Sequence, residues 1–297
     1  LAGMHAIGCD INPLGRMISE CKTTRYPISR TRQEVAKFIE KLDQVDKENL
    51  ENFSKMLREK AVGIDSWFSE ESIEDIARHM VAIEESEISG RSKKFIRLAL
   101  SDNLRRVSFQ RAREWKLYRE RDEDRKYVSL TPLVIQKLLA NLTMAEDFKR
   151  QTMGMYKSPE LKGRGVKSVI LNHNMVTGRP FRCHGSRKVG LIVTSPPYGD
   201  SATTVAYGQF SWLSNIVLGL VDSVKQSALD KEMMGGVVSP ELAPIGHEVI
   251  DRQIQEIAES MKVGKSGQSG EMRAREVHSF FVDYKRSIEN SARLLSA

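Results

Sequence analysis

The 297-residue chain is poor in cysteine, and what it lacks excludes several classes of protein. Its three cysteines, Cys9, Cys21 and Cys183, are too few and too scattered for a disulfide framework or a CxxC metal site. No apolar run approaches the roughly 18 residues that a membrane span needs. The first residues, LAGMHAIGCDINP, also lack the long apolar core of a signal peptide. We therefore expect a cytoplasmic protein without a membrane partner.

The excess of positive charge is small, because 46 Lys and Arg residues face 39 Asp and Glu residues and give a net charge of +7. A basic balance favours an anionic partner such as nucleic acid, but many basic proteins bind nothing anionic. The six histidines are scattered, with neither the HxxxH nor the His–Cys spacing of a metal site. The net charge alone does not identify the partner. The spacing of the histidines predicts no metal site.

The first half of the chain predicts one short strand followed by helices. Residues 3–12 read as a strand that ends in an acidic turn, and Pro13 opens a helix that runs through about Cys21. From about 31 to 150, apolar side chains recur at helical spacing, which is typical of a bundle core. Residues 151–167 are rich in glycine and lysine and are expected to form a loop.

Strand signals return in the second half of the chain, at 168–171 and 189–194. Helices are expected at about 209–223 and from about Met272, and residues 263–271 read as a mobile surface loop. The order is strand and helix, then helices, then strand, loop and helix. This order predicts an α/β domain interrupted by a helical insertion.

Asp10 ends the first predicted strand and is the first candidate site residue. In doubly wound folds, a carboxylate in such a turn accepts hydrogen bonds from ribose hydroxyls, roughly 20 residues after a glycine-rich loop. If Asp10 has this role, the glycine-rich loop falls before Leu1, and we expect the chain to be an internal fragment. The alternative is an Asp-x-Asn-Pro turn that binds no ligand.

The second candidate site is the segment Thr194-Ser195-Pro196-Pro197-Tyr198, directly behind the apolar run 189–193. Neither proline has an N–H, and each restrains the residue before it to an extended conformation. The result is a stiff segment at the carboxyl end of a predicted strand, where open α/β sheets bind ligands. It presents the Ser195 hydroxyl and the Pro196 carbonyl as acceptors, beside the flat ring of Tyr198.

These groups suit the exocyclic amino group of cytosine or adenine. Two acceptors that hold its hydrogens would free the nitrogen lone pair to attack a methyl group carried on a sulfonium. The base must first leave the duplex, which costs a few kcal/mol, and stacking on Tyr198 would offset about 1–3 kcal/mol of that cost. The alternative is a Pro-Pro turn that only ends a strand.

With these motifs, the sequence resembles the amino-methylating DNA methyltransferases of bacteria and archaea, which modify cytosine N4 or adenine N6. The resemblance rests on GCDINPL, LIVTSPPYGDS and TTVAYGQFSWLS, and it covers most of the chain. It implies a Rossmann-like catalytic domain with S-adenosylmethionine as the methyl donor. The implied residues are Asp10, Asn12 and Thr194 at the donor, and Ser195, Pro196, Pro197 and Tyr198 at the target base.

The resemblance also implies double-stranded DNA as substrate, a restriction–modification system and a cognate restriction endonuclease. Residues 1–30 would then belong to the cofactor-binding half, 31–165 to a helical insertion for target recognition, and 166–297 to the catalytic half. The sequence departs from the family in lacking the glycine-rich loop, so we expect these 297 residues to be inactive alone. Asn174 stands where the family often has an acidic residue, which puts the contact with the adenine ring in doubt. Carbon-5 methylation needs a cysteine, usually after a proline, and no cysteine here fits.

A basic segment at 105–121 is interpreted as helical and carries aromatic residues among its cations. It can grip phosphates and stack on bases, or it can be a solvated helix face balanced by nearby carboxylates. The candidate DNA-binding residues are Arg105, Arg106, Arg111, Arg113, Lys116 and Arg119.

Two alternatives to a DNA methyltransferase stay open at this point. The missing glycine-rich loop favours a non-catalytic DNA-binding remnant, and similar proline-proline loops also serve methylation of RNA or protein. Asp200 and Tyr207 follow the second candidate site closely, and they either line a pocket or serve as ordinary turn and packing residues.

Overall fold

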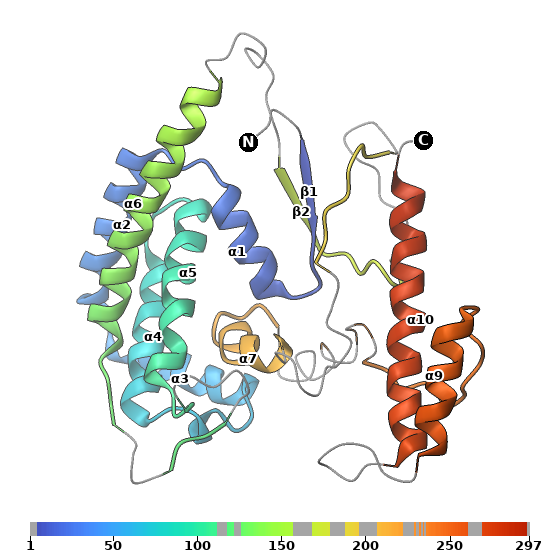
Figure 1. The fold of residues 1–297 in the computed structure, drawn as a ribbon. Helices are drawn as coiled ribbons and strands as arrows, with labels where there is room; N and C mark the ends of the chain where they lie inside the picture. The colour runs from blue at the N-terminus through green and yellow to red at the C-terminus, as the bar shows by residue number, and fades with distance from the viewer. Residues whose placement is uncertain are drawn as a thin grey trace. The chain divides into compact units, whose positions relative to one another are not determined.

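The computed structural model is mainly helical (Figure 1). It describes residues 5–111, 118–121, 126–156, 168–178, 188–195, 207–221, 229, 232, 234, 236–260 and 269–295. The chain divides into two compact units. The helical unit comprises Leu1–Leu171 and Gln209–Gln226, and the C-terminal unit comprises Asn172–Gly208 and Ser227–Ala297.

The helical unit places a series of helices between two short strands, as the apolar pattern predicted. In chain order, its elements are β1 (Ala6–Cys9), α1 (Pro13–Thr23), α2 (Ile28–Leu42), α3 (Lys47–Lys60), the short 3₁₀ helix η1 (Ile64–Ser66), α4 (Glu70–Glu85), α5 (Gly90–Val107), α6 (Leu130–Tyr156), β2 (Ser168–Leu171) and α7 (Tyr207–Val217).

Local capping residues explain where several of these helices begin. The side chain of Asp46 accepts a hydrogen bond from the Asn49 amide at the start of α3, and Ser69 does the same for the Ser72 amide at the start of α4. Such side chains satisfy amides that have no partner within the helix. Ser69 is therefore the N-cap residue of α4.

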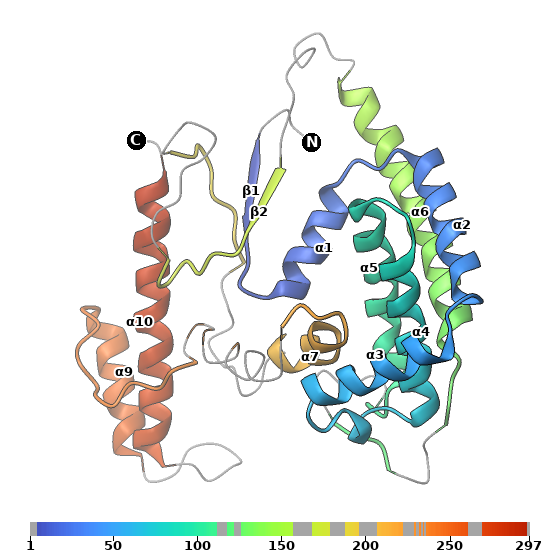
Figure 2. The same cartoon turned by 180° about the vertical axis from the view of Figure 1, so that it is seen from behind.

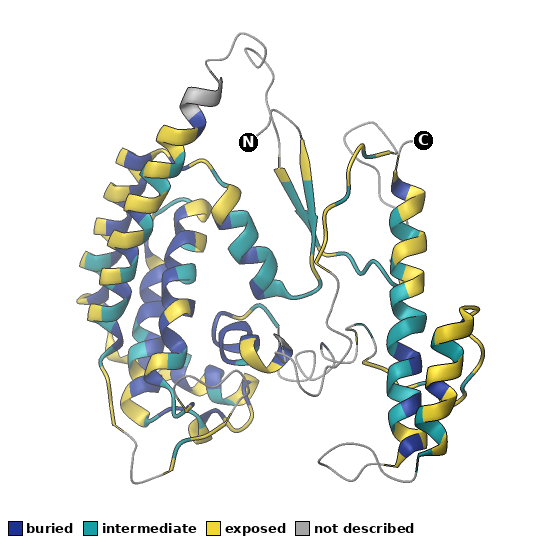
Figure 3. Cartoon of the chain, in the orientation of Figure 1, coloured by how far each residue is buried: buried dark blue, intermediate teal, exposed yellow. Residues whose placement is uncertain are grey.

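The core of the helical unit lies among α2, α4, α5 and α6. The inward faces of α4 and α5 are dark blue in Figure 3, which marks buried residues. Phe38, Ile76, Ile96, Leu100 and Leu138 are fully buried there. The predicted bundle core between about 31 and 150 is confirmed, since apolar stripes at helical spacing bury one face of each helix.

Strands β1 and β2 are parallel neighbours, with Ala6 opposite Ser168 and Cys9 opposite Leu171. The amide of Asp10 donates to the Leu171 carbonyl at 3.2 Å and extends the pairing into the turn after β1. Parallel strands need a long crossover, and here helices α1 to α6 supply it. A small parallel sheet with a long helical insertion is the described part of the predicted α/β fold.

The prediction of a helix across the basic segment is wrong beyond Val107, where α5 ends. Gln110 instead forms an antiparallel bridge with Arg119. The amide of Arg111 donates to the Tyr118 carbonyl at 2.8 Å, and the amide of Glu120 donates to the Phe109 carbonyl at 2.7 Å. We call residues 109–111 and 118–120 the arginine ribbon. Its pairing satisfies backbone groups that a helix would otherwise satisfy.

Two further predictions differ from the structure. The chain from 189 to 194 is not a strand. Among the described residues it makes one bridge, between Val189 and Leu295, and Leu191 and Val193 are 69% and 86% exposed. An apolar run forms a strand only where a neighbouring backbone pairs with it. The prediction of a loop at 151–167 is wrong for residues 151–156, because α6 continues through Tyr156. Residues 157–167 and 261–268 lie outside the described residues.

A buried carboxylate ties α2 to the start of α5. Glu34 accepts hydrogen bonds from the Ser89 amide, from the Ser89 hydroxyl at 2.8 Å and from the Ser92 hydroxyl. It also pairs with Arg30 at 2.9 Å, and its side chain is only 10% exposed. Burial alone would raise the pKa of Glu34, but these hydrogen bonds outweigh it and lower the pKa to about 2.

We expect Glu34→Gln to destabilise the helical unit by about 3 kcal/mol at neutral pH, since each pKa unit corresponds to about 1.4 kcal/mol. The folded pKa lies below the ordinary value of 4.5, so the contribution is complete above about pH 4.5 and is lost as the pH falls toward 2. Chemical unfolding followed by circular dichroism at pH 7 and pH 3 measures this. Glu40→Gln, an exposed change on the same helix, is the control. Equal losses at both pH values would contradict the assignment.

The C-terminal unit contains α9 (Glu248–Glu259) packed against α10 (Gly270–Leu294). Ile245, Ile254 and Ala274 form its small buried core. Gly270 allows the two helices to approach, because a Cβ atom there would lie 2.1 Å from the Ser260 carbonyl oxygen. The last predicted helix is thus confirmed, beginning two residues before the expected position.

Candidate functional site

The turn after β1 holds Asp10 in a defined conformation. The Asn12 amide donates to Asp10 Oδ1 at 2.8 Å, and Arg16 Nη1 donates to the carbonyls of Asp10 and Ile11 at 3.1 and 2.8 Å. Asp10 is exposed, so its carboxylate remains accessible to a ligand. Burial lowers the pKa of Arg16, while the carboxylates of Asp10 and Glu20 act in the opposite direction.

Gly15 lies directly against the Asp10 carboxylate. A Cβ atom at this position would be 2.4 Å from Asp10 Oδ2, which is closer than real Cβ contacts. Any larger residue here would therefore displace the carboxylate or the first turn of α1. The sequence motif predicted Asp10 as a site residue, but it did not indicate that Gly15 and Arg16 contact the same turn.

Asn12 connects this turn to helix α7. Its Oδ1 caps α1 by accepting from the Leu14 amide at 3.1 Å, and its Nδ2 donates to Ser211 Oγ at 3.0 Å. Asn215 Oδ1 accepts from the same Leu14 amide at 3.1 Å, and Asn215 Nδ2 donates to Asn12 Oδ1 at 3.3 Å and to Ser211 Oγ at 3.1 Å. We call Asn12, Ser211 and Asn215 the amide cluster. Sequence analysis missed the two members on α7.

Part of the second candidate site can be located. Thr194 and Ser195 are exposed and lie in the C-terminal unit. Pro196, Pro197 and Tyr198 lie outside the described residues, as does Asp200. Tyr207, the other residue considered beside them, is the first residue of α7. An accessible Ser195 hydroxyl is compatible with the role predicted for it.

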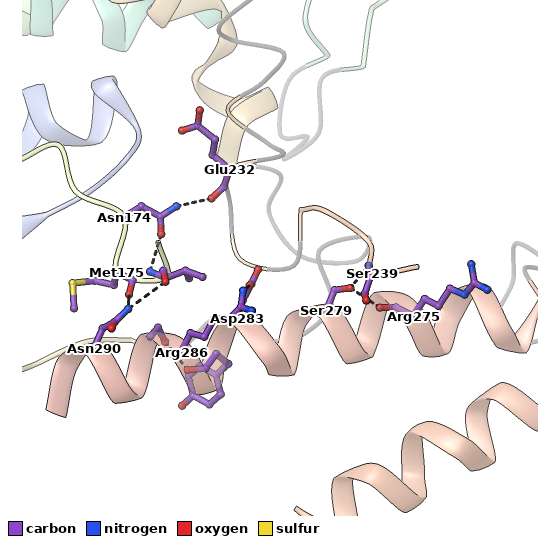
Figure 4. Close-up of polar contacts among 12 residues, drawn as sticks. Asn174, Met175, Glu232, Ser239, Arg275, Ser279, Asp283, Arg286 and Asn290 are labelled. Atoms are coloured by element: carbon purple, nitrogen blue, oxygen red, sulfur yellow. Dashed lines mark hydrogen bonds and ion pairs between the residues drawn. The ribbon is translucent and has the colours of Figure 1, made fainter. Parts of the chain in front are cut away.

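Asn174 makes two hydrogen bonds within the C-terminal unit (Figure 4). Its Nδ2 donates to the Glu232 carbonyl at 3.0 Å, and its Oδ1 accepts from the Val176 amide at 2.8 Å. Asn290 of α10 holds the same turn by donating to the Met175 and Val176 carbonyls at 2.8 and 3.2 Å. The Asn174 side chain therefore stabilises its own turn.

The candidate DNA-binding cations fall into two groups. Arg105 stacks on Phe210, with its guanidinium carbon 4.2 Å from the ring centroid, and burial lowers its pKa. Arg106, Arg111 and Arg119 are exposed, and the last two lie on the arginine ribbon. Arg113 and Lys116 lie outside the described residues.

The described residues contain neither a candidate metal site nor a helix that could span a membrane. In that part of the chain, no group of three or more histidine, cysteine or acidic side chains is arranged to hold a metal ion. None of the helices described there is long and apolar enough to cross a bilayer.

Comparison with known proteins finds similarity to the type II methyltransferases. One relative is M.MvaI of Kocuria varians, which is 32% identical over 306 aligned positions. The alignment covers 99% of this chain but 63% of the relative, so the chain spans less than two thirds of that protein's length. Neither a family model nor a solved structure matches the chain. The similarity supports a methyltransferase, the class to which the sequence motifs also pointed.

Proposed function

We propose that the chain is part of a DNA methyltransferase that transfers a methyl group from S-adenosylmethionine to the amino group of cytosine N4 or adenine N6. The observation that carries this proposal is the 32% identity to a type II methyltransferase across 99% of the chain, together with the Ser-Pro-Pro-Tyr motif. A Rossmann-like arrangement, a restriction–modification context with a cognate endonuclease, and a cytoplasmic location complete the proposal.

The residues at the end of β1 fit the donor. S-adenosylmethionine would supply an electrophilic methyl group, and its ribose offers two hydroxyl donors. Asp10 is exposed at the carboxyl end of a parallel strand, where α/β folds bind nucleotides, and a carboxylate accepts such donors. We assign Asp10 to the ribose and propose Asn12 and Thr194 as further donor-site residues.

The residues of the motif would act on the extruded base. The Ser195 hydroxyl and the Pro196 carbonyl accept hydrogen bonds from the amino hydrogens, which shifts the nitrogen toward tetrahedral geometry. Pro197 keeps the segment stiff, and Tyr198 stacks on the base. S-adenosylmethionine, when bound, would supply the methyl group and keep the electrons of the broken carbon–sulfur bond on its sulfur. The nitrogen held by Ser195 and Pro196 would gain the methyl group and lose a proton to solvent.

The experiment compares acceptors with labelled donor, using the protein at its full genomic length. We expect label in duplex DNA, at cytosine N4 or adenine N6, and none in RNA or protein. Label in RNA or protein would replace the proposed substrate. DNA binding without donor binding would instead indicate a non-catalytic DNA-binding protein.

We further propose that residues 31–165 contribute to target recognition and that the exposed cations of the arginine ribbon contact DNA phosphates. Arg113 and Lys116 lie between Arg111 and Arg119 in the sequence and are assigned the same role. Arg105 and Arg106, at the end of α5, complete the proposed set, with Arg105 also stacking on Phe210.

We expect Arg111→Ala combined with Arg119→Ala to weaken DNA binding similarly on all sequences. Each lost phosphate contact should reduce the slope of log K against log salt by about 0.9, so the pair should reduce it by about 2. Fluorescence anisotropy across a salt series measures the slope. Arg32→Ala, an exposed change on α2, should leave it unchanged. An unaltered slope in the double variant would show that the ribbon does not contact DNA.

A further inference from the structure

The amide cluster is more elaborate than a helix cap requires. Ser269 caps α10 with one side chain that accepts from the Met272 amide, as Ser69 does for α4. Asn12 already provides this cap for α1. Yet Ser211 and Asn215 reach the same point from α7, about 200 residues further along the chain. Capping alone does not account for their presence.

The two members of the cluster on α7 are buried, and Asn12 is half-buried. Asn215 is 0% exposed and Ser211 is 2% exposed. Burying an amide is costly unless it is hydrogen-bonded, and here each Asn215 side-chain group has a partner at 3.1–3.3 Å. Hydrogen bonds among buried side chains fix the positions of those side chains closely, because a small displacement leaves a buried polar group without a partner. Figures 1 and 2 both show α7 beside the first turn of α1.

The amide cluster also restrains the position of the Asp10 carboxylate. Fixing the Asn12 side chain fixes its peptide, and the amide of that peptide is the donor to Asp10 Oδ1 at 2.8 Å. Gly15 supplies the space for Oδ2 on the other side. The position of the carboxylate is therefore set by Asn12, Gly15 and, through Asn12, by α7.

We propose that Ser211 and Asn215 are positioning residues for the donor site and hold Asp10 in the geometry that receives the ribose hydroxyls. The proposal rests on the function assigned above to Asp10. It makes α7 part of the donor site, although neither residue touches the donor.

The test measures donor affinity by calorimetry and methyl-transfer kinetics on the protein at its full genomic length. We expect Asn215→Leu to raise the donor Kd about 10-fold, the effect of losing one or two buried hydrogen bonds. The KM for the donor should rise in parallel while kcat at saturating donor changes little. Ser211→Ala is a smaller change and should raise the donor Kd by less. It tests the same proposal if the Asn215→Leu variant does not fold.

The matched control is Ser214→Ala on the same helix. Ser214 also makes a buried contact, with the Ser101 hydroxyl at 3.0 Å, but it does not contact Asn12. General loosening of α7 would affect this variant equally, so a similar rise in its donor Kd would overturn the proposal.

A double-mutant cycle with Asp10→Ala separates positioning from packing. If Asn215 acts through Asp10, then Asn215→Leu should cost little further affinity once Asp10 is alanine. Additive losses would overturn the positioning role. Failure of the unaltered protein to bind the donor would overturn the proposed function and this inference together. Donor binding that depends on Asp10 but not on Asn215 would overturn this inference alone.

Discussion

Replacing Ser195 with alanine is expected to lower kcat for methyl transfer by about 10²- to 10³-fold, in the range seen when one preorganised hydrogen-bonding group at a reacting centre is removed. The hydroxyl would be one of two acceptors that hold the target amino group, and the Pro196 carbonyl would be the other. Single-turnover transfer of labelled methyl to duplex DNA measures this step without contributions from product release.

The variant is informative because Ser195 is exposed, so the change removes one hydroxyl without opening a cavity. Ser29→Ala makes the same chemical change at an exposed position on α2 and should leave the rate unchanged. The melting temperature and donor Kd of both variants should match those of the unaltered protein. A Ser195→Ala enzyme with full activity would show that the motif is only a turn.

The sequence predicted the elements whose signals are local. Strand β1 and helix α1 followed from an apolar run, an acidic turn and a proline at the first helical position. The apolar residues at helical spacing predicted the bundle core. These signals act within a few residues, which is why they can be read without knowing the fold.

The predictions that failed depend on partners distant in the chain. Phe109 donates its amide to the Trp67 carbonyl at 2.7 Å, and the ribbon pairs Gln110 with Arg119. Neither contact can be predicted from the spacing of apolar and charged residues within the segment. That local spacing favours a helix. The apolar run at 189–194 predicts a strand, but the described residues do not provide the backbone pairing that a strand needs.

The amide cluster left a weak signal that was overlooked. Ser211, Ser214 and Asn215 fall at positions i, i+3 and i+4, on one face of a helix whose other residues are largely apolar. A polar stripe on a buried helix predicts polar partners elsewhere in the fold. The sequence cannot say which partners, because the Asn12 and Ser211 side chains meet across 199 residues.

Replacing Asp10 with alanine is expected to raise the donor Kd by about 10²- to 10³-fold. The carboxylate would accept both ribose hydroxyls, and hydrogen bonds to charged groups contribute about 1.5–3 kcal/mol each. Asp10→Asn should lose less, because its amide oxygen can still accept from the Asn12 amide and from one hydroxyl. Calorimetric titration with S-adenosylhomocysteine, the product form of the donor, measures both variants.

Asp43→Ala removes an exposed carboxylate at the end of α2 and should leave the donor Kd unchanged, which excludes an effect of net charge. Donor analogues that lack one ribose hydroxyl sharpen the test. The unaltered protein should bind them more weakly than the donor, whereas Asp10→Ala should discriminate little between them, because the group that reads the hydroxyls is gone. If Asp10→Ala keeps full donor affinity, the proposal is wrong. The Asp-x-Asn-Pro turn after β1 would then only cap α1, and the donor would bind elsewhere.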